Sequence, residues 1–273
     1  MKDFAGKIVF ITGGASGIGL EAGRQMALLG AHLVVLDYNP TDAAHEALEA
    51  ARRLPSQRVA RFQMDISDRH QVLEVVAKAV KECGTPDLLL NSAGIGMAGE
   101  FLGSKFEDFD RVMRINMYGT RNICEAVVPF MAERRQGRIV LVASMAGHIA
   151  IYGYTGYATS KFAVRGFAEA LRYELKPLGI SVQCLCPGEV DTPMVAEEHK
   201  TIHPATWALK KAAGTVSVDV PVADLIRGII RNNPMIISGG MSRLMFWIHR
   251  LTPPRLWYAY CDRAVRGALE KMK

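Results

Sequence analysis

The sequence IVFITGGASGIG, residues 8–19, decides the fold class of this chain. Its first four residues are apolar, as in a buried strand, and they run directly into a glycine-rich turn and an apolar, helix-like segment. Glycines at this spacing let the backbone turn sharply and let a pyrophosphate approach a helix N-terminus. Because strand and helix signals flank the glycines, the stretch predicts a dinucleotide-binding unit; a turn that only joins a strand to a helix is the alternative.

Outward from this stretch, strand-like runs and helical stretches alternate along the chain. The expected strands are 8–11, 32–37, 59–65, 88–91, 138–143, 180–186 and 235–237. The expected helices are 17–29, 41–53, 68–83, 107–134, 157–176 and 221–232. Repeated βαβ units predict an α/β, doubly wound Rossmann-type fold with a seven-stranded parallel sheet.

The length of 273 residues suits one α/β domain. We expect a Rossmann-type, NAD-binding catalytic domain over residues 1–240 and a helical extension over 241–273 packed on that domain. The Pro253-Pro254 pair should divide the extension into two short helices. The irregular segment 191–220 is the expected lid, since it follows the sixth strand, where ligand-covering loops occur.

Composition excludes several classes of protein. The hydrophobic content of 49% and charged content of 22% are those of a folded globular chain, not a disordered one. No run of eighteen apolar residues and no signal-peptide pattern is found, so we expect a cytoplasmic protein. The five cysteines form no CxxC motif, and we expect no bound metal.

Asp37 ends the second expected strand, eighteen residues after Gly19, where the 2′-hydroxyl of an adenosine ribose needs an acceptor. A carboxylate there would repel a 2′-phosphate, and Ala15, Ser16 and Tyr38 supply no cation to offset it, so the predicted cofactor is NAD. Capping of the turn before Pro40 is the alternative role. Asp65 follows the third strand and is expected to contact the adenine ring or to cap its own turn.

Tyr157 and Lys161 stand four residues apart, hence on one face of a helix. An ammonium there would stabilise the phenolate and so lower the pKa of the tyrosine, with help from an oxidised nicotinamide. Ser144 ends the fifth strand, at the sheet edge where doubly wound proteins bind ligands. Asn116 interrupts a long helical stretch, where its amide can hold a distortion or a water.

With these motifs in place, the chain resembles the short-chain dehydrogenase/reductase family, in its single-domain form, over about residues 5–240. Its Asn-Asn-Ala-Gly motif stands here as Asn91-Ser92-Ala93-Gly94, with serine in place of the second asparagine. The resemblance implies a catalytic tetrad of Asn116, Ser144, Tyr157 and Lys161. In it, Tyr157 exchanges a proton with the substrate, Lys161 binds the nicotinamide ribose, Ser144 orients the carbonyl and Asn116 holds a water.

The expected cofactor-binding residues combine the glycine turn, the strand ends and the Pro-Gly segment of the family. They are Gly13, Ser16, Gly17, Ile18, Gly19, Asp37, Asp65, Ile66, Asn91, Ala93, Gly94, Tyr157, Lys161, Pro187, Gly188, Val190 and Thr192. The resemblance also implies that the long helices pair, which predicts a homodimer or homotetramer.

Residues that flank the tetrad in sequence are mostly apolar and should select the substrate. They are Met97, Met145, His148, Ile149, Ile151, Tyr154, Met194 and Trp207. Methionine-rich surroundings favour a lipid, steroid, terpenoid or aromatic secondary alcohol over a sugar, with core packing as the alternative role. His199 and His203 have metal-ligand spacing, yet no metal is expected in an exposed lid.

Most of the net charge of +6 lies in the tail, where basic residues accompany apolar ones at helical spacing. Such a helix can rest on an anionic membrane, which predicts a peripheral membrane contact through residues 243–272; packing on the domain or on a subunit is the alternative. The tail lacks a nucleic-acid-binding motif, so no nucleic acid is expected.

The leading functional hypothesis is therefore an NAD(H)-dependent oxidoreductase that interconverts an apolar secondary alcohol and its ketone. The first alternative is an NADPH-type carbonyl reductase of the 3-oxoacyl or 3-ketosphinganine kind. The second is a nucleotide-sensing module without turnover, because a fold alone does not prove an activity.

Overall fold

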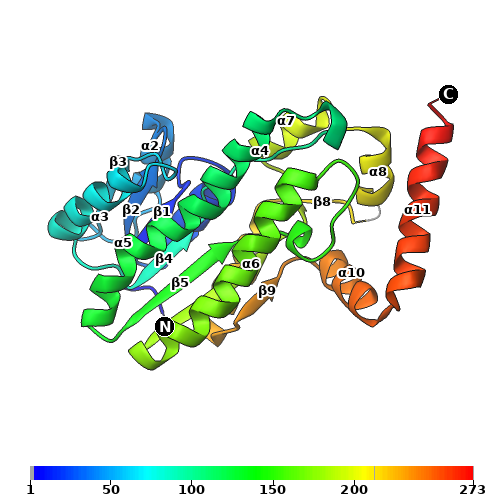
Figure 1. The fold of residues 1–273 in the computed structure, drawn as a ribbon. Coiled ribbons are helices and arrows are strands. Elements are labelled where there is room, and N and C mark those ends of the chain that lie inside the picture. Colours follow the sequence, from blue (N-terminus) through cyan, green and yellow to red (C-terminus); the bar gives the residue numbers. More distant parts are fainter. Residues whose placement is uncertain (1–2, 212, 273) are drawn as a thin grey trace.

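A seven-stranded parallel sheet forms the centre of the computed structural model, which describes residues 3–211 and 213–272 (Figure 1). The order of strands is β3-β2-β1-β4-β5-β6-β9, which confirms the expected doubly wound fold. The strands are β1 (Ile8–Thr12), β2 (His32–Asp37), β3 (Val59–Gln63), β4 (Leu88–Asn91), β5 (Gly137–Val142), β6 (Ile180–Cys186) and β9 (Met235–Ile237). The order reverses between β1 and β4, so a crevice opens beyond their carboxyl ends.

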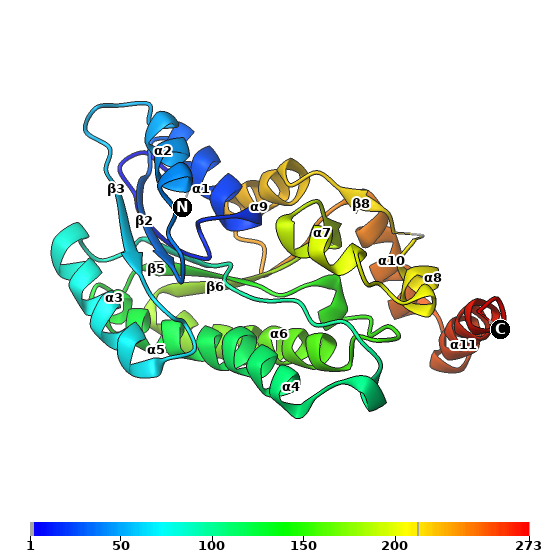
Figure 2. The same cartoon turned by 90° about the horizontal axis from the view of Figure 1, so that it is seen from above.

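Helices cover both faces of this sheet (Figure 2). One face carries α1 (Gly17–Leu28), α2 (Asp42–Ala50) and α9 (Asp219–Arg231); the other carries α3 (Arg69–Cys83), α4 (Phe106–Met113), α5 (Gly119–Glu133) and α6 (Thr155–Leu175). The central strands are mostly apolar because both of their faces are buried: Leu88, Leu89 and Leu90 of β4 are fully inaccessible. Each face of the sheet thus has its own hydrophobic core.

The helix expected over residues 107–134 is divided by a π-helical turn, η2 (Arg114–Tyr118), between α4 and α5. Asn116 lies within this turn and is buried. The sequence suggested a distortion at this residue, and π-turns of this kind often occur at functional sites. Three short 3-10 turns complete the helical inventory of the described residues: η1 (Phe101–Gly103), η3 (Met145–Gly147) and η4 (Lys176–Leu178).

The lid segment is more regular than its sequence suggested. It contains α7 (Pro193–His199) and α8 (Pro204–Lys210), and β7 (Glu189–Val190) pairs in parallel with β8 (Thr215–Val216). Prolines at the first helical positions of α7 and α8 need no hydrogen-bond partner there, which is why both helices begin where they do. The two-stranded pairing ties the end of the lid to the segment that follows β6.

The C-terminal extension forms two helices, α10 (Gly240–Leu251) and α11 (Pro254–Glu270), separated at Thr252 and Pro253 as the proline pair predicted. Helix α11 packs against α8 of the lid and otherwise projects from the end of the molecule (Figure 1). Residues 1 and 2 of the expected catalytic domain, residue 212 of the expected lid and residue 273 of the extension lie outside the described residues. None of the helices described is both long and apolar enough to span a membrane.

Candidate active site

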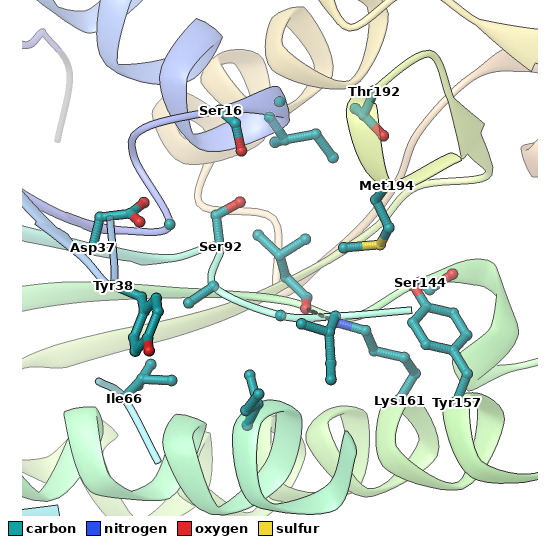
Figure 3. A pocket seen from close by; sticks show the side chains of 18 of the residues that line it. Ser16, Asp37, Tyr38, Ile66, Ser92, Ser144, Tyr157, Lys161, Thr192 and Met194 are labelled. Atoms are coloured by element: carbon teal, nitrogen blue, oxygen red, sulfur yellow. Dashed lines mark hydrogen bonds between the residues drawn. The ribbon is translucent and has the colours of Figure 1, made fainter. Parts of the chain in front are cut away.

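A cavity of about 560 Å³ lies at the carboxyl ends of β1, β4 and β5, at the point where the strand order reverses. Figure 3 shows Asp37 and Tyr38 at one end, Ser16 and Ser92 along the middle, and Ser144, Tyr157 and Lys161 at the other end. A cavity of this size and position is where doubly wound proteins hold a dinucleotide.

The glycine turn leaves room for a phosphate group. Gly13 has φ of +65°, and a Cβ on it would lie 2.7 Å from the backbone nitrogen of Ala93. Gly17 has φ of +52°, and Ser16 stands at the N-cap of α1 without capping a backbone N–H through its side chain. The N–H groups of the first turn of α1 therefore stay available for an anion, which fits a pyrophosphate.

Most of the expected cofactor-binding residues line this cavity. They are Gly13, Ser16, Gly17, Ile18, Asp37, Asp65, Ile66, Ala93, Gly94, Tyr157, Lys161, Pro187, Gly188, Val190 and Thr192. These residues come from the ends of several strands, from the turns after them and from α6, so only the folded sheet brings them together.

Gly19 and Asn91 lie behind the lining of the cavity rather than in it. A Cβ on Gly19 would stand 2.1 Å from the carbonyl oxygen of Gly13, so glycine is required here for packing of the turn. The buried amide of Asn91 accepts a hydrogen bond from Thr12 Oγ1 (2.6 Å) and donates one to Thr120 Oγ1 (2.8 Å). Both residues support the turns that form the cavity.

Asp37 lines the cavity and is also held by its own backbone surroundings. Its Oδ2 accepts a hydrogen bond from Ala15 N (3.0 Å), and its Oδ1 accepts one from Asn39 N (2.9 Å). The two roles considered from the sequence, ligand contact and turn capping, are thus compatible. Asp65 also lines the cavity, while its Oδ1 accepts from both the N–H and the hydroxyl of Ser67.

Tyr157 and Lys161 lie one turn apart on α6, as their spacing predicts. The Lys161 ammonium stands 5.7 Å from the centre of the Tyr157 ring and donates a hydrogen bond to Val142 O at 3.1 Å, which Figure 3 marks. Ser144, two residues after β5, accepts a hydrogen bond from Ala146 N (3.1 Å), which fixes its side chain.

Burial dominates the electrostatics of this pair. It raises the pKa of Tyr157 to about 12, although a hydrogen bond with the Ser144 hydroxyl acts in the opposite direction. It also lowers the pKa of Lys161 to about 8, because an ammonium without a carboxylate partner is costly to bury. Lys161 by itself therefore does not lower the pKa of Tyr157 below its ordinary value, and the lowering expected from Lys161 together with an oxidised nicotinamide stays a prediction.

The Asn116 amide fastens the loop after β4. Its Oδ1 accepts a hydrogen bond from Ile95 N (2.9 Å), and its Nδ2 donates to Ile95 O (3.0 Å) and Ser160 Oγ (2.9 Å). A Cβ on Gly94 would come within 3.1 Å of that Oδ1 and 3.4 Å of Lys161 Nζ. The side chain thus holds the loop beside Lys161, and its own hydrogen-bonding capacity is used by the protein.

A second, smaller cavity of about 150 Å³ adjoins the first. The two cavities have five lining residues in common: Ser144, Tyr157, Gly188, Met194 and Val195. The smaller one also contains five of the residues that the sequence assigned to the substrate, namely Met97, Met145, Ile149, Ile151 and Tyr154. Its lining is largely apolar, and it places the phenol of Tyr157 between the two cavities.

Two residues expected at the substrate lie elsewhere. His148 is buried against α6 and α10, with Nδ1 3.2 Å from Arg165 Nη1 and its ring edge-to-face with Phe246 at 5.0 Å. Burial lowers the pKa of His148 to about 4. Trp207 is 43% exposed and packs edge-to-face on His199. The turn η3 after Ser144 directs His148 away from the cavity, which its position in the sequence did not indicate.

Three charged residues of the smaller cavity were not expected from the sequence: Glu189, Glu198 and Lys210. Glu189 directly follows the Pro-Gly segment, and this position alone was a signal of proximity to the site. Glu198 and Lys210 lie in the lid, and only the packing of α7 and α8 brings them to the cavity.

Comparison with known proteins identifies the family. The short chain dehydrogenase family matches residues 7–203. The chain belongs to this family. It is 35% identical to the 3-ketodihydrosphingosine reductase of Mus musculus over 233 residues, 84% of this chain and 70% of the relative. It is 30% identical to the estradiol 17-beta-dehydrogenase 11 of Rattus norvegicus over 257 residues, 93% of this chain and 82% of the relative.

Solved structures agree with this assignment. A short-chain dehydrogenase/reductase from Burkholderia phymatum in complex with NAD superposes with a TM-score of 0.80 at 25% identity, covering 92% of this chain and 94% of the neighbour. The chain is thus an oxidoreductase of a family that uses nicotinamide cofactors. The sequence relatives support the carbonyl-reductase alternative better than the expected alcohol dehydrogenase.

Proposed function

We propose that this protein transfers a hydride between a nicotinamide dinucleotide and the carbonyl of a lipid-like ketone of the 3-ketodihydrosphingosine kind. The observation that carries the proposal is the wall shared by the two cavities. Ser144 and Tyr157 face both the cavity that fits a dinucleotide and the apolar cavity that fits the reacting end of a lipid. The names of the most similar curated relatives support the choice of substrate.

The bound cofactor supplies the hydride, and the roles of the protein groups follow from their positions. Tyr157, with its pKa raised to about 12, is protonated at neutral pH and donates its proton to the carbonyl oxygen. Ser144 donates a hydrogen bond to the same oxygen and so orients the ketone. Lys161 holds the ribose at the far side of Tyr157, and Asn116 positions the loop that covers it. The positive charge of an oxidised nicotinamide would favour the phenolate in the reverse direction.

We further propose NAD(H) rather than NADP(H) as the cofactor. The Asp37 carboxylate lines the adenosine end of the cavity and is suited to accept from a ribose 2′-hydroxyl. Its neighbours Ala15, Ser16 and Tyr38 supply no positive charge for a 2′-phosphate. The proposed substrate class is therefore based on the sequence relatives, whereas the proposed cofactor is based on Asp37.

The volume of the smaller cavity suggests how the substrate enters. About 150 Å³ accommodates only the reacting end of a lipid, and we propose that its tail leaves past Met245 of α10, which lines the cavity. The same helix exposes Leu244, Trp247, Ile248 and Leu251, together with Arg243 and Arg250. We propose that this face of α10 rests on an anionic lipid surface and receives the substrate from it.

We also propose a homo-oligomer that pairs α5 and α6. Phe162 and Tyr173 of α6 remain exposed in the single chain, as expected for residues that a second copy covers. Light scattering coupled to size-exclusion chromatography tests this proposal directly, since a monomer mass would contradict it.

The decisive experiment measures NADH consumption by the full chain with 3-ketodihydrosphingosine in mixed micelles, with Tyr157→Phe as the control. Activity of the wild type that is absent from the variant would support the proposal. NADH binding without turnover of this ketone, or of a panel of long-chain ketones, would instead favour a nucleotide-sensing module.

A further inference from the structure

A cluster of charged residues closes one side of the otherwise apolar substrate cavity. Lys210 Nζ lies 2.5 Å from Glu189 Oε2 and 2.6 Å from Glu198 Oε1. The Tyr154 hydroxyl donates to Glu198 and accepts from Lys210 Nζ at 2.7 Å. All three charged residues line the cavity, and their side chains are only 8% (Glu189), 16% (Glu198) and 10% (Lys210) exposed.

The charges of this cluster do not balance, since two carboxylates face one ammonium. Glu189 Oε1 has further partners in Thr215 Oγ1 and His199 Nε2, the latter at 2.9 Å. Glu189 Oε2 is buried and pairs with the Lys210 ammonium, which it shares with Glu198. One ammonium shared by two largely buried carboxylates leaves excess negative charge that is costly to bury, unless a ligand supplies a further positive donor.

The cluster lies close to the reacting groups. Tyr154 packs edge-to-face on Tyr157, with 5.5 Å between ring centres, and its hydroxyl bonds to Glu198. Glu189 directly follows Gly188, which belongs to the wall shared by both cavities. After burial, which is the main cause, the negative charge of Glu198 also contributes to the raised pKa of Tyr157. A group bound by these carboxylates would therefore stand near the carbon that exchanges hydride.

From these contacts we infer that Glu189 and Glu198 select a substrate that carries a protonated amine close to its ketone or alcohol carbon. An ammonium group supplies further donors to the two carboxylates and offsets the excess negative charge of the cluster. The apolar remainder of the cavity accepts the hydrocarbon chain. This inference rests on the proposed oxidoreductase function and adds to it the polar group that the site recognises.

A structural latch is the competing explanation for the same residues. The cluster joins β7, α7, α8 and the segment before α6, so it also fastens the lid to the catalytic helix. A latch would affect every substrate equally, because its loss loosens the site without regard to the ligand. Amine recognition instead affects only substrates that carry the charge.

The test compares three alcohols with NAD: 2-aminooctan-3-ol, its N-acetyl derivative and octan-3-ol. Each oxidation yields the ketone, NADH and one proton. We expect kcat/KM of the wild type for the free amine to exceed that for either neutral analogue by about tenfold or more, the effect of a charged hydrogen bond. In Glu189→Gln and Glu198→Gln this ratio should fall to about one to threefold, because one carboxylate then remains to balance Lys210.

Two further variants separate recognition from a latch. Glu197→Gln is the matched control, since Glu197 lies on α7 beside Glu198 but is exposed and pairs with Lys200. This variant should leave the ratio of kcat/KM values unchanged. Lys210→Met removes the competing ammonium, so the preference for the amine should persist or rise even if overall activity falls.

The outcomes distinguish the inference from the proposed function. Equal rates of the wild type on all three alcohols, or an equal loss on all three in the two glutamine variants, would overturn amine recognition while the oxidoreductase assignment stands. Failure of the wild type to oxidise any of them, or to reduce the corresponding ketones with NADH, would overturn both.

Discussion

The two cavities that meet at Tyr157 are built in different ways. The larger one is formed by backbone turns at the ends of neighbouring strands, where glycine allows a close approach to the ligand. The smaller one is formed by side chains from the lid, α10 and the start of α6, which lie far apart in the sequence. The comparison suggests that cofactor binding depends on local geometry, whereas substrate choice depends on how the lid packs.

The position of Tyr157 between the cavities gives the largest expected effect. Tyr157→Phe removes the proton donor but keeps the ring, so we expect kcat to fall by about 10²–10⁴. NADH affinity should change by no more than about twofold to threefold, because the cofactor cavity keeps its other contacts. Steady-state rates and fluorescence titration of NADH measure the two quantities. Comparable losses of kcat and of NADH affinity would mean that Tyr157 contributes to cofactor binding as much as to the chemical step.

The cofactor cavity is tested at its opposite end. Asp37→Ala removes the carboxylate acceptor, and we expect the preference for NADH over NADPH to fall by about 10–100-fold, corresponding to a lost charged hydrogen bond and a relieved repulsion. The measurement is a titration of each cofactor against wild type and variant. Tighter binding of NADPH than NADH by the wild type would contradict the NAD assignment and favour an NADPH-dependent reductase.

Lys161 is expected to lower the stability of the folded state. Its pKa is lowered to about 8 by burial, so at neutral pH the folded state must hold a buried ammonium. Lys161→Met should therefore raise the free energy of unfolding by about 1–3 kcal/mol near pH 7, while activity is lost.

The sign of this effect defines its pH dependence. Between about pH 8 and the ordinary lysine pKa, the unfolded chain binds more protons at this position than the folded chain does. The contribution of this residue to wild-type stability thus rises with pH, and the advantage of Lys161→Met should shrink over this window. Urea unfolding of both proteins across it is the measurement, and a constant difference would refute the assignment.

The smallest effect is expected at the outer edge of the substrate cavity. Trp247→Glu with Leu251→Glu places charge on the exposed face of α10, where both side chains are largely solvent-accessible. We expect cosedimentation with anionic liposomes to fall by about threefold or more, with little change in the unfolding temperature. Lys78→Glu, a basic residue on the other side of the sheet, is the control. Equal cosedimentation of all three proteins would remove the membrane proposal.

The sequence by itself determined the sheet, the cofactor turns and the Tyr157–Lys161 pair. These features depend on short spacings: glycines within one turn, an acidic residue at a strand end, and two side chains one helical turn apart. A distortion or a bound water at Asn116 was also suggested, because a polar residue interrupted a long helical pattern, and the structure has a π-turn there. Short-range geometry of this kind can be read from the order of residues alone.

Only the tertiary structure decided which side chains surround the substrate. His148 follows Ser144 closely in sequence but turns toward Arg165, whereas Lys210 is 49 positions beyond Lys161 and reaches the cavity through the lid. The pKa of Tyr157 is likewise set mainly by burial, which outweighs the hydrogen bond with Ser144. Burial and long-range packing depend on the position of every element at once, and no local spacing encodes them.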